Sequence, residues 1–343
     1  RILHLMAEKK ASDVYLSPRA PATIKINGEY LPINSQPLPV DGPMNLLLDI
    51  VPPNRIEELK ETGELNTAIP LHGVGNFRLS AMRQRGMYAA VIRFISPDIP
   101  PLHTLNLPDV LRTLVLEKRG LILMVGATGA GKSTTLAAMI NHLNETEYAH
   151  VLTVEDPIEF VHESKKCLIN QREVGPMTHS FSNALRSALR EDPDAILVGE
   201  MRDLETIRLA MTAAETGHLV FGTLHTSSAA KTIDRIIDVF PAEEKEMVRA
   251  MLSESLQAVI SQTLCKNKDG SGRVAAHEIM IGTPAIRNLI REAKVAQMYS
   301  AIQTGQSLGM QTLDQNLTEL VRRNVISAAE ARSKAKIPEN FPG

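Results

Sequence analysis

A glycine-rich segment near the middle of the chain has the residue types and spacing of a phosphate-binding loop. It reads Gly126-Ala-Thr-Gly-Ala-Gly-Lys132-Ser133 and fits the pattern G-x-x-x-x-G-K-[ST] at every position. An apolar run, 121–125, precedes it, and a helix-like stretch, 134–141, follows. In this order, backbone N–H groups and a helix amino terminus face phosphates. We therefore predict that ATP is bound by Gly126, Ala127, Thr128, Gly129, Ala130, Gly131, Lys132, Ser133 and Thr134.

Lysine and serine at the end of this loop have separate expected roles. Lys132 neutralises the β- and γ-phosphates, and Ser133 is a ligand of Mg²⁺. Hydrolysis also needs a carboxylate near the metal ion and the attacking water. Residues 195–198 form an apolar run that ends in Gly199-Glu200, as in a Walker B strand, except that Gly199 stands where an aspartate is usual. Glu200 is the second expected metal-site residue.

A second acidic segment is the expected source of the carboxylate that is missing at Gly199. It reads Thr153-Val-Glu155-Asp156-Pro-Ile-Glu159 and follows a buried-type strand. Ligand groups in parallel sheets gather where strands end. A solvated acidic loop is the alternative interpretation, and the departure at Gly199 favours the functional one.

Histidines flank a further apolar strand, in Gly217-His218-Leu-Val-Phe-Gly-Thr-Leu-His225-Thr226. Spacing alone favours two structural histidines. Because this would be the third set of polar residues at a strand end, we predict that His225 and Thr223 sense the γ-phosphate.

The chain before the phosphate loop has a different pattern. Two hairpins are expected, one turning at Asn27-Gly28 and one near Gly86, with Phe77, Leu79 and Ala81 on a single face. Prolines 97, 100 and 101 then interrupt regular structure, and strand–helix alternation follows. We predict an α/β protein with a small amino-terminal domain at 1–98, a proline-rich linker at 99–105 and the nucleotide-binding domain at 106–343. The last domain should have a mostly parallel, helix-covered sheet and a helical carboxyl-terminal region.

Composition excludes several other classes of protein. A net charge of -2, no tryptophan and 3% aromatic residues argue against a nucleic-acid partner. The two cysteines lack the spacing of a zinc site, and we expect no disulfide. No apolar run is long enough to span a bilayer, and the start at Arg1 reads as the end of an amphipathic helix. These features predict a cytoplasmic protein or a peripheral one on the cytoplasmic side of a membrane.

The four motifs together resemble the secretion ATPase superfamily, in which Gly-Glu is the usual end of the Walker B strand. Within it the chain is similar to the type IV pilus retraction ATPases, the PilT family, over essentially its whole length. The resemblance is carried by Glu155-Asp-Pro-Ile-Glu-Phe-Val-His, Leu197-Val-Gly-Glu-Met-Arg-Asp-Leu-Glu-Thr and Ala285-Ile-Arg-Asn-Leu-Ile-Arg-Glu292. Segments of the amino-terminal half, such as Val14-Tyr-Leu-Ser-Pro and Lys118-Arg-Gly-Leu, are nearer to the paralogous PilU family.

The resemblance implies a PAS-like amino-terminal α+β domain and a RecA-like P-loop ATPase domain, assembled as a homo-hexamer with Mg-ATP at the interfaces. It implies that Glu159 is the general base and that Glu200 supports Mg²⁺. His218 and His225 bound a nucleotide-contacting segment, and Arg78 and Arg93 approach the phosphates. The implied function is pilus retraction and twitching motility, with an inner-membrane platform protein as partner at the cytoplasmic face.

Three rival functions stay open at this stage. The first is an accessory PilU-like ATPase that works with a paralogous retraction ATPase. The second is a ring subunit that does not hydrolyse ATP, and the third is a nucleic-acid-dependent RecA-like motor.

The segment 285–292 has an apolar stripe, and we expect it to pack rather than to contact ATP.

Overall fold

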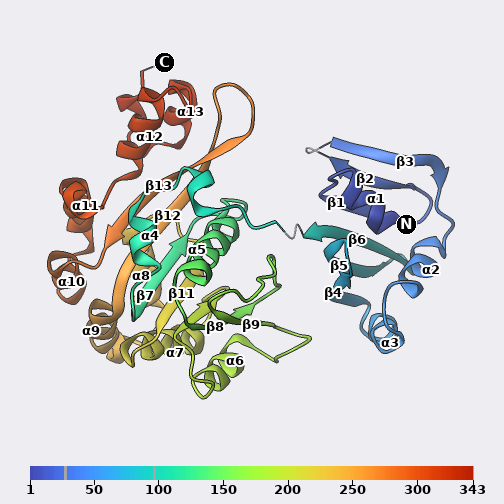
Figure 1. Cartoon of the computed structure of the whole chain (residues 1–343), viewed down its shortest axis with the longest axis horizontal. Helices are drawn as coiled ribbons and strands as arrows, with labels where there is room; N and C mark the ends of the chain where they lie inside the picture. The colour runs from blue at the N-terminus through green and yellow to red at the C-terminus, as the bar shows by residue number, and fades with distance from the viewer. Residues whose placement is uncertain (27–28, 96–97, 343) are drawn as a thin grey trace. The chain divides into compact units, whose positions relative to one another are not determined.

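The computed structural model describes residues 1–26, 29–95 and 98–342, and the predicted turn at Asn27-Gly28 and Pro97 lie outside them. The chain divides into two compact units, Arg1–Asp98 and Ile99–Gly343 (Figure 1). Each unit has its own sheet and its own hydrophobic core, and each is described separately.

The first unit is an antiparallel sheet in the order β3-β2-β1-β6-β5-β4. Three helices cover one face, because side chains of all three share a core with Phe77, Leu79 and Ala81. Burial of these three residues confirms the predicted alternation along the second hairpin, which turns at Arg85 and Gly86, both with positive φ. The elements are α1 (Ile2–Glu8), β1 (Asp13–Leu16), β2 (Pro21–Ile26), β3 (Glu29–Pro37), α2 (Gly42–Leu48), α3 (Pro53–Thr62), β4 (Glu64–Leu71), β5 (Gly75–Gln84) and β6 (Met87–Ile95).

The second unit is built on a sheet in the order β13-β12-β7-β11-β10-β8-β9. Among the described strands of this sheet, only β13 pairs antiparallel, with β12, so the predicted mostly parallel, helix-covered sheet is confirmed. The elements up to β13 are η1 (Leu102–Leu105), α4 (Val110–Leu114), β7 (Gly120–Val125), α5 (Lys132–Thr146), β8 (His150–Glu155), β9 (Leu168–Glu173), α6 (Phe181–Ala188), β10 (Ala195–Val198), α7 (Leu204–Glu215), β11 (Leu219–Leu224), α8 (Ala229–Asp238), η2 (Ala242–Glu244), α9 (Lys245–Ser255), β12 (Leu256–Lys266) and β13 (Arg273–Ile281).

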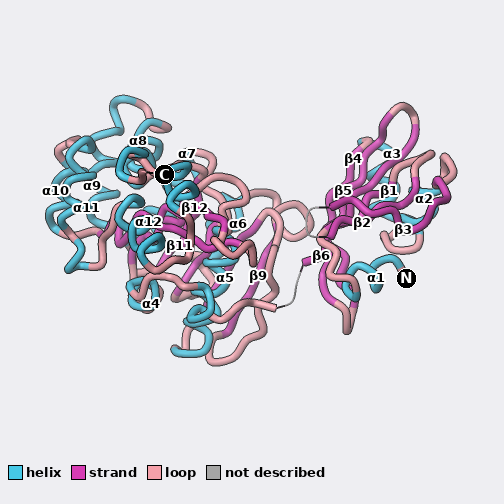
Figure 2. The backbone as a smooth tube through the Cα atoms, turned by 90° about the horizontal axis from the view of Figure 1, so that it is seen from above, coloured by secondary structure: helices cyan, strands magenta, loops and turns pink. Residues whose placement is uncertain are grey.

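Helices pack on both faces of this sheet, as Figure 2 shows in cyan around the magenta strands. Along β7, Leu121, Leu123 and Val125 join one core with α6 to α9, while Ile122 and Met124 join another with α4 and α5. Continuous apolar strands are what burial on both faces requires. Among the described residues, no helix is long and apolar enough to cross a membrane.

The carboxyl-terminal region is helical, as predicted, and comprises α10 (Pro284–Arg291), η3 (Val295–Gln297), α11 (Met298–Thr304), η4 (Gln306–Leu308), α12 (Leu313–Arg322), α13 (Ala328–Lys334) and η5 (Pro338–Asn340).

Helix α10 carries the retraction-family segment and packs as expected. Ile286 and Ile290 are fully buried, and Thr283 caps the helix by accepting the N–H of Ile286. Arg287 donates through Nη1 to the carbonyls of Ser253 and Glu254, both at 2.6 Å, where α9 ends. Since the last carbonyls of a helix lack partners within it, this arginine joins α10 to the end of α9.

Candidate nucleotide site

The strand order brings the predicted motifs to one edge of the second sheet. Strands β7, β11, β10 and β8 are neighbours and parallel, so their carboxyl ends lie side by side. The phosphate loop follows β7, His225 follows β11, Glu200 lies just beyond β10, and the acidic segment follows β8. Polar groups that are far apart in the sequence therefore meet at this edge.

The phosphate loop occupies Gly126, Ala127, Thr128, Gly129, Ala130 and Gly131, and Lys132, Ser133 and Thr134 open helix α5. Gly126 and Gly131 have φ of 150° and 81°, which favour glycine. A Cβ on Gly126 would lie 2.4 Å from the carbonyl oxygen of Gln262, so the loop packs directly on β12. Gly131 is the N-cap of α5 and provides no side-chain cap. The loop and helix terminus thus fit a phosphate group.

The ammonium group of Lys132 lies inside the curve of the loop. It donates to the carbonyls of Gly126 at 2.5 Å and Ala127 at 3.1 Å, and lies 3.3 Å from Nδ1 of His225. Burial lowers the pKa of Lys132, while the carboxylates of Glu200 and Glu159 act in the opposite direction. Both carboxylates are therefore within electrostatic range of the lysine.

A line of contacts continues from Lys132 to the end of β10. Nε2 of His225 lies 3.2 Å from Oε1 of Glu200, and the guanidinium of Arg202 lies 2.6 Å from Oε2 of the same carboxylate. The hydrogen bond from Arg202 is the main cause that lowers the pKa of Glu200, so this carboxyl is ionised at neutral pH. His225 therefore lies between Lys132 and Glu200 and contacts both. Thr223 donates to the carbonyl of Gly199.

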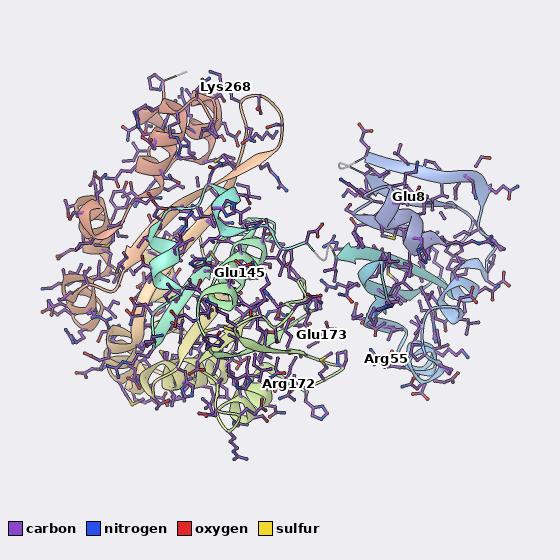
Figure 3. All side chains as sticks on the ribbon, viewed as in Figure 1. Glu8, Arg55, Glu145, Arg172, Glu173 and Lys268 are labelled. Atoms are coloured by element: carbon purple, nitrogen blue, oxygen red, sulfur yellow. The ribbon has the colours of Figure 1, made fainter. Side chains whose placement is uncertain are left out.

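The acidic segment is anchored to the neighbouring strand β9. Glu173 of β9, labelled in Figure 3, accepts the N–H of Ile158 at 3.1 Å. Gln171 accepts the N–H of His162 at 2.8 Å and donates to the carbonyl of Phe160 at 2.8 Å. These bonds fix the backbone on both sides of Glu159, whose own side chain is exposed. A fixed backbone with an exposed carboxylate suits a group that must reach a bound water.

Glu155 differs from Glu159 in its surroundings. Its Oε1 accepts the hydroxyl of Thr153 at 2.7 Å and the amide of Gln171 at 3.2 Å. Burial is the main cause that raises the pKa of Glu155 to about 7, against these hydrogen bonds. A raised pKa means that ionising this carboxyl costs stability in the folded protein.

Replacing Glu155 by glutamine is expected to remove a pH dependence of stability. The carboxyl favours the folded state fully below its ordinary pKa of 4.5, and that contribution is lost as pH rises through about 7. Glutamine keeps the acceptor for Thr153 and does not titrate. The free energy of unfolding of Glu155→Gln minus that of the wild type should therefore increase between about pH 4.5 and 7. The increase should be at most about 3.5 kcal/mol, since one pKa unit is ~1.4 kcal/mol.

Denaturant unfolding of both proteins at several pH values measures this difference. A difference that stays constant with pH, or that falls as pH rises, would contradict the environment described for Glu155.

His218 is a correction to the predicted contacts. It lies before the amino end of β11, where its carbonyl accepts the N–H of Gly120 at the start of β7, and its Nδ1 contacts the carbonyl of Ala213 at 3.0 Å. The six residues of β11 lie between it and His225, and at ~3.3 Å per residue the two histidines are about 23 Å apart. His218 is therefore at the opposite edge of the sheet and cannot contact a nucleotide held by the phosphate loop of its own chain.

Arg78 and Arg93 lie in the first unit, directly opposite each other on β5 and β6. Arg93 donates through Nε to Asp13 on β1 at 2.9 Å. The side chain of Arg93 is 62% exposed, and that of Asp13 is 5% exposed. Cross-strand partners share a face, and two like charges side by side destabilise a sheet unless an anion balances them. The carboxylate of Asp13 supplies such an anion for Arg93.

Two further arginines of this hairpin have local partners or lie in the turn. Arg83 donates to the carbonyl of Lys60 and to the hydroxyl of Tyr88, and Arg85 is a turn residue.

Two residues of the site were missed by sequence reasoning. Arg202 pairs with Glu200. It lies in the segment after β10 that resembles the retraction ATPases, but the spacing of residues in that segment does not indicate the partner of this arginine. Gln262 on β12 contacts the phosphate loop from a strand that carries no motif. Among the described residues, no group of three or more His, Cys, Asp or Glu side chains could hold a metal ion.

The chain is similar to known proteins of one family over nearly its whole length. The family model described as "Type II/IV secretion system protein" matches residues 6–332. The chain is 61% identical to the type IV pilus retraction ATPase PilT of Pseudomonas aeruginosa over 340 residues, covering 99% of this chain and 98% of that protein. It is 40% identical to the type IV pilus ATPase PilU of the same organism, covering 98% and 88%. A crystal structure of the pilus retraction motor PilT with bound ADP superposes with a TM-score of 0.92 and 45% identity, covering 99% and 98%.

Proposed function

Because the chain belongs to the type II/IV secretion system protein family, and within it to the type IV pilus retraction ATPases, we propose that it hydrolyses Mg-ATP to drive pilus retraction. The observation that carries the proposal is the line of contacts from Lys132 through His225 to Glu200 at the mouth of the phosphate loop. The bound ADP in the solved PilT structure supports an adenine nucleotide as the ligand.

In this proposal the phosphates of ATP lie against the loop N–H groups and the amino end of α5. Lys132 exchanges its two loop carbonyls for phosphate oxygens, which are stronger partners because they are charged. The hydroxyl of Ser133 and the ionised carboxyl of Glu200 would hold Mg²⁺. The metal ion, when bound, neutralises charge on the phosphate oxygens.

Glu159 would orient the attacking water and accept its proton. Its carboxylate is exposed and within electrostatic range of Lys132, which binds the phosphates. His225 and Thr223 would sense the γ-phosphate, since His225 contacts both Lys132 and Glu200. As a general base, Glu159 would contribute about 10²–10⁴-fold to the rate of hydrolysis.

Arg78 and Arg93 would supply positive charge to the phosphates from the first unit of this chain or of a neighbouring subunit. Release of that contact after hydrolysis would move one unit against the other. We propose a homo-hexamer as the working assembly, an inner-membrane platform protein as its partner, and a position at the cytoplasmic face of that membrane. The identities of 61% to PilT and 40% to PilU favour the retraction motor over the accessory ATPase.

Replacing Arg78 by alanine is expected to lower ATP turnover by at least about tenfold, because arginines that stabilise the transferred phosphoryl group contribute more than this. Arg85→Ala is the matched control, since Arg85 lies in the turn that follows the same strand. Steady-state phosphate release by the two purified variants makes the comparison. Equal rates in both variants would show that Arg78 is only a surface charge.

Complementation of a retraction-deficient strain tests the function as a whole. The wild-type chain should restore twitching, and Lys132→Ala expressed at the same level should not. If the strain assembles pili but stays immobile when it expresses the wild-type chain, the proposed function is wrong.

A further inference from the structure

Strand β12 runs beside the phosphate loop and places one buried amide under it. β12 pairs in parallel with β7 as far as Ser261 and Val125, so the next residue, Gln262, lies level with the start of the loop. Its side chain is 3% exposed. The strand carries no recognised motif, and the proposed mechanism makes no use of it.

The amide of Gln262 makes three hydrogen bonds, one of them to the loop itself. Nε2 donates to the carbonyl of Ala130 at 2.7 Å. Oε1 accepts from the hydroxyl of Thr135 at 2.8 Å and from Nε2 of His277 at 2.8 Å. Thr135 and His277 are also buried. Because a reversed amide would set its oxygen against the carbonyl of Ala130, these partners fix the orientation of the amide.

The bond to Ala130 determines where the following N–H points. The peptide between Ala130 and Gly131 is trans and planar, so its carbonyl and its N–H point in opposite directions. With the carbonyl held towards Gln262, the N–H of Gly131 faces away from β12, towards the open side of the loop. Gly131 is also the N-cap of α5, whose first amides lack partners within the helix.

We propose that Gln262 is a positioning residue for nucleotide binding, which holds the Ala130–Gly131 peptide so that the N–H of Gly131 is directed at the phosphates. The inference rests on the proposed nucleotide site and adds a residue that acts on it from an adjacent strand. Gln262 itself does not touch the nucleotide.

The same amide links the loop to the carboxyl-terminal region. His277 on β13 donates its backbone N–H to Asn316 of α12 at 2.8 Å, and its carbonyl accepts from Gln311 at 3.0 Å. Burial lowers the pKa of His277 to about 4, so the ring is neutral and donates through Nε2. Its Nδ1 is buried with no hydrogen-bond partner among the described residues. The contacts therefore run from the loop through Gln262 and His277 to α12.

Substitution of Gln262 in the full-length chain, with Mg-ADP as the probe, tests the inference. Gln262→Met keeps the size of the side chain and removes the donor to Ala130. We expect its Kd for Mg-ADP to rise at least about tenfold, and its KM for ATP to rise with little change in kcat, since the N–H of Gly131 binds substrate and transition state alike. Thr135→Val is the control, because it removes a bond of the same network but leaves the one to Ala130.

The control separates positioning from general loss of stability. Both variants should lower the melting temperature without nucleotide, whereas Thr135→Val should bind Mg-ADP within about twofold of wild type if only the Ala130 bond matters. If Gln262→Met does not fold, Gln262→Asn replaces it, because its shorter amide cannot reach Ala130 and Thr135 together. An unchanged Kd in the folded Gln262 variant, or an equal rise in the Thr135 variant, would overturn the inference. Failure of the wild-type chain to bind Mg-ADP would instead overturn the proposed function and this inference with it.

Discussion

Lys132→Ala is expected to weaken binding of Mg-ATP and Mg-ADP by roughly 10- to 200-fold. Hydrogen bonds to charged groups contribute about 1.5–3 kcal/mol each, and tenfold in Kd corresponds to ~1.4 kcal/mol. The lysine ammonium is already inside the loop, on the carbonyls of Gly126 and Ala127, so the wild type needs only an exchange of partners. Titration calorimetry with each nucleotide measures the loss.

Lys118→Ala is the control for the loss of a lysine charge. Lys118 is 82% exposed and pairs with Glu147 at 3.4 Å, away from the loop. Its substitution should leave both nucleotide affinities within about twofold of wild type, as expected for a surface ion pair. Equal affinities of the Lys132 and Lys118 variants would rule out the loop as the phosphate site.

Glu159→Gln is expected to separate binding from hydrolysis. Glutamine has the same shape, so the Kd for Mg-ATP should change little. It cannot accept a proton from water, so kcat should fall by about 100-fold or more. A single-turnover assay with excess protein measures the chemical step, and calorimetry on the same preparation measures binding.

The matched control is Glu163→Gln, which changes an exposed carboxyl of the same segment, four residues along. It should hydrolyse ATP at the wild-type rate. Normal turnover by Glu159→Gln would remove Glu159 as the base and leave Glu155, whose pKa of about 7 also suits proton transfer, as the carboxyl to test next.

The residues whose positions the sequence predicted best are those that depend on local order in the chain. The phosphate loop needs a strand, glycines at fixed positions and a helix, and all of these lie within residues 120–146. Glu200 and Glu159 follow strands that are apolar throughout, and a parallel sheet places such positions at one edge. The register of Arg78 and Arg93 follows in the same way, since they lie equally far from the turn at Arg85 and Gly86.

His218 shows where a motif taken as a unit is misleading. A strand has two ends, and only the residues after a parallel strand share an edge with the phosphate loop. His218 precedes β11, so the parallel sheet places it at the edge opposite the phosphate loop of its own chain. Gln262 is the converse case, because its contact with Ala130 joins residues 132 positions apart and depends on β12 lying next to β7. No local pattern reports that pairing.

Phosphate release by the purified full-length chain, with Mg-ATP and no partner protein, is the measurement that tests the central claim most directly. We expect steady turnover that stops when magnesium is chelated and that Lys132→Ala lacks. A wild-type chain that is folded and releases no phosphate above the Lys132→Ala background would contradict the claim that this site hydrolyses ATP.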